Sequence, residues 1–115
     1  MNDGWVRNAT ITRVVDGDTV VADIDLGYRV HVREYLRLHG INAPEKRGET
    51  KAAGERSMNH LIELLAEHGG KLCRVVIKSH KNKAGKYGRW IAEIIAGDIN
   101  INQQMIDDGH AVEYR

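Results

Sequence analysis

The sequence contains three short clusters of charged and polar residues. Each cluster lies beside a glycine or a proline at the end of an expected strand. They read D-G-D-T at residues 16–19, R-L-H-G-I-N-A-P-E at 37–45 and K-Y-G-R-W at 86–90. Carboxylate and amide oxygens are ligands for hard cations, and guanidinium groups bind phosphate oxygens through paired hydrogen bonds. Each cluster taken alone is explained by a turn with exposed charges. A purely structural domain would not need all three.

Basic residues are concentrated in one part of the chain. Residues 71–92 contain seven lysines and arginines and no acid. The rest of the chain contains ten basic and sixteen acidic residues, so the formal net charge of the whole chain is only +1. Such a local excess favours a surface for polyanions such as nucleic acid. Lys81 and Lys83 are candidate substrate contacts in this run, and a solvated lysine-rich loop is the alternative explanation.

Length and composition limit the class of protein. A chain of 115 residues, 42% of them hydrophobic, can bury one real core, so we expect a single domain over residues 1–115. The one cysteine, Cys73, excludes an internal disulfide and a four-thiolate zinc site. No apolar run is long enough for a membrane span, and no leader-like segment starts the sequence. We therefore expect a cytoplasmic protein with no membrane association and no obligate protein partner.

The first 40 residues read as strands that would position the first two clusters. Apolar and polar residues alternate over 9–15, 19–26 and 28–38, which is the period of a half-buried strand. The inner faces of these strands are expected to include Ile11, Val15, Val20, Leu26, Leu36 and Leu38. Because Arg37 stands between two of these leucines, its side chain must point away from the core.

The rest of the chain supplies two helices and two more strands. Thr50 can cap a helix whose apolar stripe is Met58, Leu61, Ile62 and Leu65, and which ends at Gly69-Gly70. Strands are expected at 73–77 and 89–96, followed by a short helix from its cap Asn102 to Gly109. This order predicts a mainly β or α+β fold. It is the layout of the OB-fold, a five-stranded Greek-key barrel with a helix between strands 3 and 4 and a short C-terminal helix.

In chain order, the three clusters resemble the signature of the staphylococcal nuclease (thermonuclease) family, which reads D-G-D-T, R-L-x-G-I-[DN]-x-P-E and K-Y-G-R. The resemblance covers roughly residues 9–113, with the helix in the expected place. It implies a nuclease that hydrolyses phosphodiester bonds in DNA and RNA with Ca²⁺ as cofactor, leaving a 3′-phosphate and a 5′-hydroxyl. We expect single strands to be preferred, because they enter a cleft beside a barrel more easily.

The resemblance also implies catalytic and substrate-binding roles. Arg37 and Arg89 occupy the family's two arginine positions, where guanidinium groups bind the phosphate oxygens that gain charge during attack. Glu45 occupies the position of the general base for the attacking water, and orientation of that water is the competing role. Lys86 and Tyr87 match residues that contact a terminal phosphate of the bound nucleotide.

The same resemblance implies a calcium site. Asp18, the Asn42 side chain and the backbone carbonyl of Ala43 could supply oxygen ligands, with Asp16 and Thr19 as supporting neighbours. The best-known member of the family has aspartate where this chain has Asn42. One formal charge is thereby lost, so we expect weaker calcium binding or acceptance of other divalent ions. An asparagine that only hydrogen-bonds its own turn is the alternative.

Two functions stay open from the sequence. The first is a small endonuclease or exonuclease, and the second is a catalytically weak or inactive OB-fold module that binds nucleic acid. Asp18, Arg37, Glu45 and Arg89 favour the enzyme, because a binding module has no need for this set of acids and cations. A structural or protein-binding OB-fold would explain none of the three clusters. Tyr114 is a further candidate for a contact with a base or a phosphate.

Overall fold

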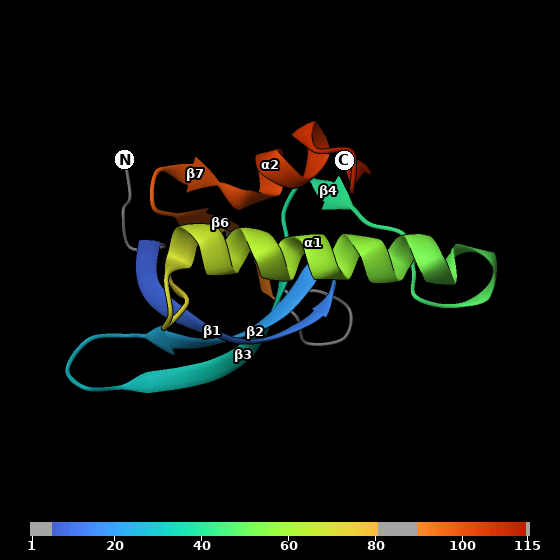
Figure 1. Cartoon of the computed structure of the whole chain (residues 1–115). Coiled ribbons are helices and arrows are strands. Elements are labelled where there is room, and N and C mark those ends of the chain that lie inside the picture. The colour runs from blue at the N-terminus through green and yellow to red at the C-terminus, as the bar shows by residue number, and fades with distance from the viewer. Residues whose placement is uncertain (1–5, 81–89, 115) are drawn as a thin grey trace.

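The computed structural model describes residues 6–80 and 90–114. Its main sheet consists of β1 (Val6–Asp16), β2 (Thr19–Asp25), β3 (His31–Leu38), β5 (Arg74–Ser79), β6 (Trp90–Ala96) and the short β7 (Ile99–Asn100). Neighbouring strands are antiparallel in the order β3-β2-β1-β5-β6-β7 (Figure 1). β3 also pairs in parallel with β6. This pairing closes the five longer strands of the described chain into the expected mixed, OB-like barrel.

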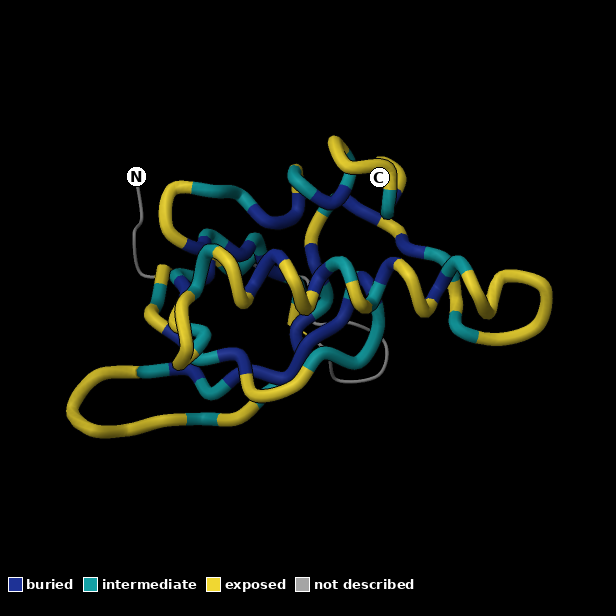
Figure 2. The backbone as a smooth tube through the Cα atoms, viewed as in Figure 1, coloured by how far each residue is buried: buried dark blue, intermediate teal, exposed yellow. Residues whose placement is uncertain are grey.

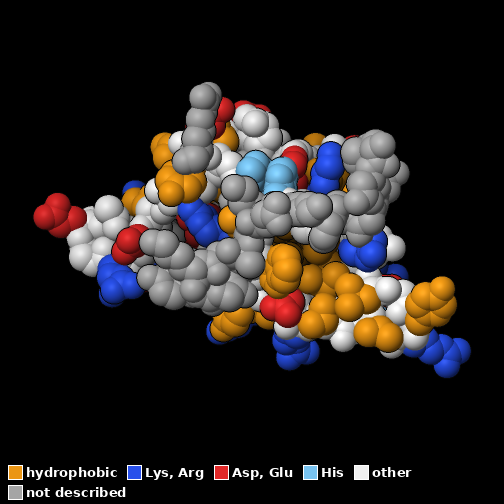
Figure 3. All heavy atoms as spheres, turned by 180° about the vertical axis from the view of Figure 1, so that it is seen from behind, with side chains coloured by type: hydrophobic (Ala, Val, Ile, Leu, Met, Phe, Trp, Pro, Cys, Tyr) orange, Lys and Arg blue, Asp and Glu red, His pale blue; other side chains and the backbone are white. Residues whose placement is uncertain are grey.

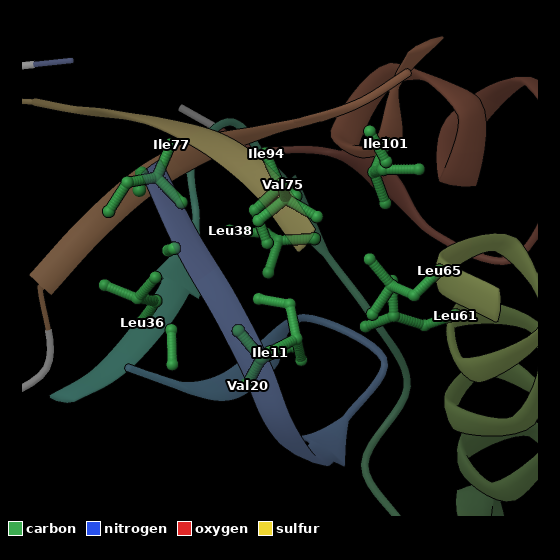
Figure 4. Close-up of a cluster of buried hydrophobic side chains, with 14 of the residues drawn as sticks. Ile11, Val20, Leu36, Leu38, Leu61, Leu65, Val75, Ile77, Ile94 and Ile101 are labelled. Carbon is green, nitrogen blue, oxygen red and sulfur yellow. The ribbon is translucent and has the colours of Figure 1, made fainter. Parts of the chain in front are cut away.

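The core lies between the barrel wall and two helices. Leu36 and Leu38 of β3 are both 1% exposed and lie inside the barrel (Figure 4). The long helix α1 (Lys51–Gly69) adds Leu61 and Leu65 to the same cluster, and the short helix α2 (Ile101–Asp107) adds Ile101. One side of α1 is therefore buried and the other exposed (Figure 2). The sequence predicted that Leu36 and Leu38 face the core, and the structure confirms it.

The N-terminal half of α1 differs from its sequence prediction. Thr50 closes a 3₁₀ turn, η2 (Gly48–Thr50), and its hydroxyl donates to the carbonyls of Glu45 (2.8 Å) and Arg47 (3.1 Å) without capping the helix. Ile62, expected in the apolar stripe, is 44% exposed. Leu61 and Leu65 of the expected stripe are buried, together with Gly54, Ser57 and Leu64. Within residues 6–80 and 90–114, no helix combines the length and apolarity that a bilayer crossing would need.

Two irregularities change which residues of the first strands face inward. Register shifts between Ile11 and Arg13 and between Val14 and Asp16 mark bulges in β1. Because each bulge adds a residue to one strand, Val14 packs against the core in place of the expected Val15. Cys73, expected as the first residue of a strand, lies in the turn just before β5, which begins at Arg74. Burial raises the pKa of the Cys73 thiol, which fits a packing role.

The β2–β3 hairpin extends beyond the barrel (Figure 1). Strand β3 begins at His31 and not at residue 28, because Tyr28 and Arg29 adopt positive φ angles of 54° and 64° and form the turn. Leu26 was expected in the core but is 45% exposed, since it lies past the end of β2. Hydrophobic side chains gather at this end of the molecule, with lysine or arginine beside them (Figure 3).

The C-terminal part of the described chain returns to the segment after β3. Two short strands, β4 (Ile41–Asn42) and β8 (Val112–Glu113), pair antiparallel. Asn100, and not Asn102, caps α2 by accepting a hydrogen bond from the Gln103 N–H (3.1 Å). Asn102 is 4% exposed and bonds to the backbone of His39, Ala92 and Ile94. This buried asparagine thus ties α2 to β6 and to the end of β3.

Candidate active site

The β1–β2 turn and β3 bring Asp18 and Arg37 together. Thr19, the first residue of β2, lies opposite Arg37 in the antiparallel pair, and the N–H of Leu38 donates to the carbonyl of Asp18 (2.8 Å). The sheet register therefore fixes both residues. Oδ2 of Asp18 lies 3.2 Å from Nη1 of Arg37, and the two side chains are only 13% and 20% exposed.

The Asp18 carboxylate is held by two further donors. The backbone N–H of Ala43 donates to Oδ2 (2.9 Å), and the Thr19 hydroxyl donates to Oδ1 (3.1 Å). Thr19 is itself 2% exposed, so its hydroxyl is fixed by packing. A carboxylate with these contacts is oriented before any ligand arrives. Two of the residues that the sequence placed beside Asp18 thus contact it directly.

The Arg37 guanidinium is oriented by residues on three segments. Its Nη2 donates to Oδ1 of Asn42 on β4 (3.2 Å), and its Cζ lies 5.6 Å from the centre of the Tyr114 ring, within the range of a cation–π contact. The N–H of Tyr114 donates to the carbonyl of Gly40 (2.9 Å). In the described part of the chain, Nη1 is buried without a hydrogen bond, so its contact with Asp18 is an ion pair only.

An open hollow of about 680 Å³ lies beside this pair. Its lining consists of Asp16, Asp18, Arg37, Asn42, Ala43, Pro44, Glu45, Lys46 and Arg47. The Glu45 carboxylate is 74% exposed and lies 3.5 Å from Nε of Arg47, at the solvent side of the hollow. Nζ of Lys46 lies 3.8 Å from Oδ1 of Asp16. Sequence reasoning did not single out Lys46 and Arg47, although both directly follow Glu45 in the second cluster.

The remaining predicted residues lie outside the described part of the chain. These are Lys81, Lys83, Lys86, Tyr87 and Arg89. The roles given to them on the sequence stay predictions.

Two glycines let the site loops approach α1 closely. A Cβ on Gly54 would stand 2.5 Å from the carbonyl oxygen of Glu45 and 2.7 Å from the backbone N of Lys46. A Cβ on Gly17, between the two aspartates of the first turn, would stand 1.9 Å from the hydroxyl oxygen of Ser57. The helix therefore serves as the surface on which the two loops that carry the acidic residues are placed.

Gly54→Ala is expected to displace Glu45 and to lower both stability and activity. The added methyl meets backbone atoms, which cannot rotate away, so we expect a loss of about 1–3 kcal/mol in the free energy of unfolding. Thermal denaturation and a cleavage assay measure the two effects. Gly69→Ala in the same helix is the matched control, because its nearest contact would be an ordinary 3.5 Å. Equal behaviour of the two variants would contradict the close approach.

The donors in the hollow suit a hard divalent cation. Carboxylate, amide and backbone carbonyl oxygens are available from Asp18, Asn42 and Ala43, and such cations prefer oxygen ligands. The Asn42 oxygen already accepts a bond from Arg37, but an amide oxygen has two lone pairs. No group of three or more histidine, cysteine, aspartate or glutamate side chains suited to a metal occurs within residues 6–80 and 90–114. The candidate set therefore relies on a single carboxylate.

Comparison with known proteins agrees with this fold. The family model described as staphylococcal nuclease homologue matches residues 35–115. A probable staphylococcal-like nuclease of Oryza sativa subsp. japonica, CAN3, is 30% identical over 87 residues, which cover 75% of this chain and 20% of that protein. A second rice protein of the same description, CAN2, is 29% identical over 87 residues, or 75% of this chain and 21% of its own length. The chain spans about a fifth of the curated relatives it matches, and it belongs to the staphylococcal nuclease family.

Proposed function

We propose that this chain is a divalent-metal-dependent nuclease that hydrolyses phosphodiester bonds of DNA and RNA. The observation that carries the proposal is the single hollow in which Asp18, Arg37, Asn42 and Glu45 line one space. Family membership suggests a nuclease. The hollow adds an oriented guanidinium, a set of oxygen donors and an accessible carboxylate, which are the groups that phosphodiester hydrolysis needs.

Each side chain has a task in this reaction. Arg37 binds nonbridging oxygens of the phosphate and stabilises the charge that develops on them. Glu45, whose carboxylate is 74% exposed to solvent, accepts the proton of the attacking water. As the new P–O bond forms, the bond from phosphorus to the 5′ oxygen breaks, and the departing oxygen takes a proton from solvent, which leaves a 3′-phosphate and a 5′-hydroxyl. Arg89 is proposed as the second guanidinium, on the strength of the sequence pattern alone.

Ca²⁺ is the proposed cofactor, held by Asp18, the Asn42 amide oxygen and the Ala43 carbonyl. When bound, it would neutralise phosphate charge and polarise the nucleophile. The Asp18 carboxylate is suited to this task because Thr19 and the Ala43 N–H already fix its orientation. Other divalent ions are included in the proposal because the candidate set carries only one formal charge.

The competing function is a module that binds nucleic acid without cutting it. The neutral Asn42 is the observation that favours it, since a weakly held metal would reduce turnover. The oriented Asp18–Arg37 pair favours the enzyme, because binding alone would be served by exposed lysines.

Cleavage of denatured DNA and of RNA, with Ca²⁺ and with EDTA, tests the proposal. We expect cleavage only with the metal, and products whose 5′ ends accept phosphate from a kinase without prior phosphatase treatment. Arg56→Gln, a change at an exposed arginine of α1, is the control variant and should cut normally. Salt-sensitive binding without cleavage under any divalent ion would establish the binding module instead.

Asn42→Asp is expected to tighten Ca²⁺ binding by roughly tenfold, because it adds one formal charge to the ligand set. Isothermal titration calorimetry measures the affinity. Asn59→Asp makes the same change of charge at an exposed position of α1 and should leave the affinity unchanged. If both variants bind Ca²⁺ like the parent chain, residue 42 is not a metal ligand and only hydrogen-bonds Arg37.

A further inference from the structure

One row of side chains on β3 leads away from the candidate active site. Arg33, Tyr35 and Arg37 alternate along the strand with residues that face the core, so all three project from its outer face. Alternate residues of a strand stand about 6.6 Å apart along it, a spacing comparable to the step between nucleotides in an extended single strand. The row therefore combines two guanidinium groups with an aromatic ring between them.

Tyr35 is held as a fixed platform. Its side chain is 45% exposed, while its hydroxyl accepts a hydrogen bond from Nη2 of Arg13 on β1 (3.0 Å). Val21, its partner across the sheet, is 7% exposed. A hollow of about 480 Å³ adjoins the ring and is lined by Thr12, Arg13, Val21, Arg33, Glu34 and Tyr35. An aromatic ring fixed at one end and open on its face loses little entropy when a base stacks on it.

Arg33 is available for a ligand. It is exposed, and it makes no ion pair within residues 6–80 and 90–114. Asp23 lies opposite Arg33 in the β2–β3 pair, but its Oδ1 lies 3.6 Å from Nδ1 of His31. Among the described elements, the main contacts of β3 are with its sheet neighbours β2 and β6. No described helix covers this row.

We propose that the outer face of β3 is an extended binding subsite for single-stranded nucleic acid, in which Tyr35 stacks on a base and Arg33 binds a phosphate. The strand would run from the phosphate held by Arg37 towards the β2–β3 hairpin. This inference rests on the proposed function, because it assigns the substrate path of the same site. It makes the protein selective for substrates longer than a dinucleotide.

Fluorescence anisotropy with labelled oligothymidylates in EDTA tests the subsite. One probe is long enough to cover the row, and the other is a thymidine dinucleotide. Tyr35→Ala should weaken binding of the long probe by about tenfold, while Tyr35→Phe should retain most of the affinity. Arg33→Gln should reduce the dependence of log affinity on log salt by about 0.7, the value for one phosphate contact on a single strand. The preference for the long probe should fall in both Tyr35→Ala and Arg33→Gln.

Arg56→Gln, on the exposed side of α1, is the matched control and should keep the salt dependence of the parent chain. Circular dichroism melts identify any variant that fails to fold, and the exposed Arg33 provides a test that does not depend on Tyr35. If the parent chain binds and cuts DNA while Arg33→Gln and Tyr35→Ala keep its length preference, the subsite is refuted and the nuclease proposal stands. If the parent chain binds neither probe and cuts nothing, both proposals fail.

Discussion

Arg37→Ala should lower the cleavage rate by about 10²- to 10³-fold, the typical effect of losing one donor to the charge of a transition state. The guanidinium is held by the Asp18 carboxylate, the Asn42 amide and the Tyr114 ring, so its orientation is set before substrate binds. Arg37→Lys should restore only part of the rate, because an ammonium group cannot form two parallel hydrogen bonds with a phosphate. Steady-state kinetics on denatured DNA measure these losses.

Arg37→Ala is also expected to lower the free energy of unfolding, which is measured separately from the cleavage rate. Asp18 would lose its ion-pair partner but keep the donors Thr19 and Ala43, so we expect a decrease of about 1–3 kcal/mol in the free energy of unfolding. Urea denaturation gives this value, and assays are run where each variant is folded. Arg56→Gln controls for loss of an exposed arginine. An Arg37→Ala variant that is folded and cuts at the rate of the parent chain would remove Arg37 from the reaction.

Local sequence patterns were sufficient to predict part of the candidate site. The alternation in β3 predicted that Arg37 points outward, and the turn at residues 16–19 brings Asp18 to the end of the same sheet. Both follow from the period of a strand and from hairpin pairing, which act over short stretches of chain. That Asp18 and Arg37 share one site was expected from the family resemblance, and the β2–β3 register explains why they lie close together.

Contacts between distant segments could not be predicted in the same way. Asn102 appeared to be a helix cap, yet it is buried and bonds to His39 and Ala92, far away in the sequence. Gly54 was not singled out from the sequence, but it is where the helix meets Glu45. Neither position is marked by periodicity, because its role depends on which segment packs against it. The bulges in β1 are a related case, since an inserted residue changes the face of every residue after it.

The candidate site consequently depends on the helix as much as on the barrel. The sheet fixes Asp18 and Arg37 through its register, but Glu45 follows β4 and is placed by the backbone contact at Gly54 and by the Thr50 hydroxyl. Its carboxylate is exposed and, among the residues that the structure describes, forms an ion pair with Arg47 alone, which is also exposed. An exposed pair of this kind contributes little to stability. The backbone at Glu45 is thus fixed, while its side chain is free to reach a bound water.

Glu45→Gln should reduce cleavage by about 10²- to 10⁴-fold, the usual contribution of a general base. The amide keeps the size of the side chain but cannot accept the proton of the attacking water at neutral pH. Because the carboxylate is 74% exposed, we expect no measurable change in the thermal denaturation midpoint. The pH dependence of kcat/KM should lose its acidic limb in the variant. Loss of rate with the acidic limb intact would indicate that Glu45 only orients water.

Glu49→Gln is the matched control for this prediction, since it removes another exposed carboxylate from η2, four residues further along the chain. It should cut at the rate of the parent chain. That result would show that the lower rate of Glu45→Gln is not caused by the change in net charge near the hollow. Arg47→Gln separates the ion pair from the carboxylate: if the pair restrains Glu45, this variant should cut at least as fast as the parent chain. A Glu45→Gln variant that retains more than about a hundredth of the parent rate is outside the range expected for a general base. That result would leave the Asp18–Arg37 pair as the centre of the site and would require another base for the attacking water.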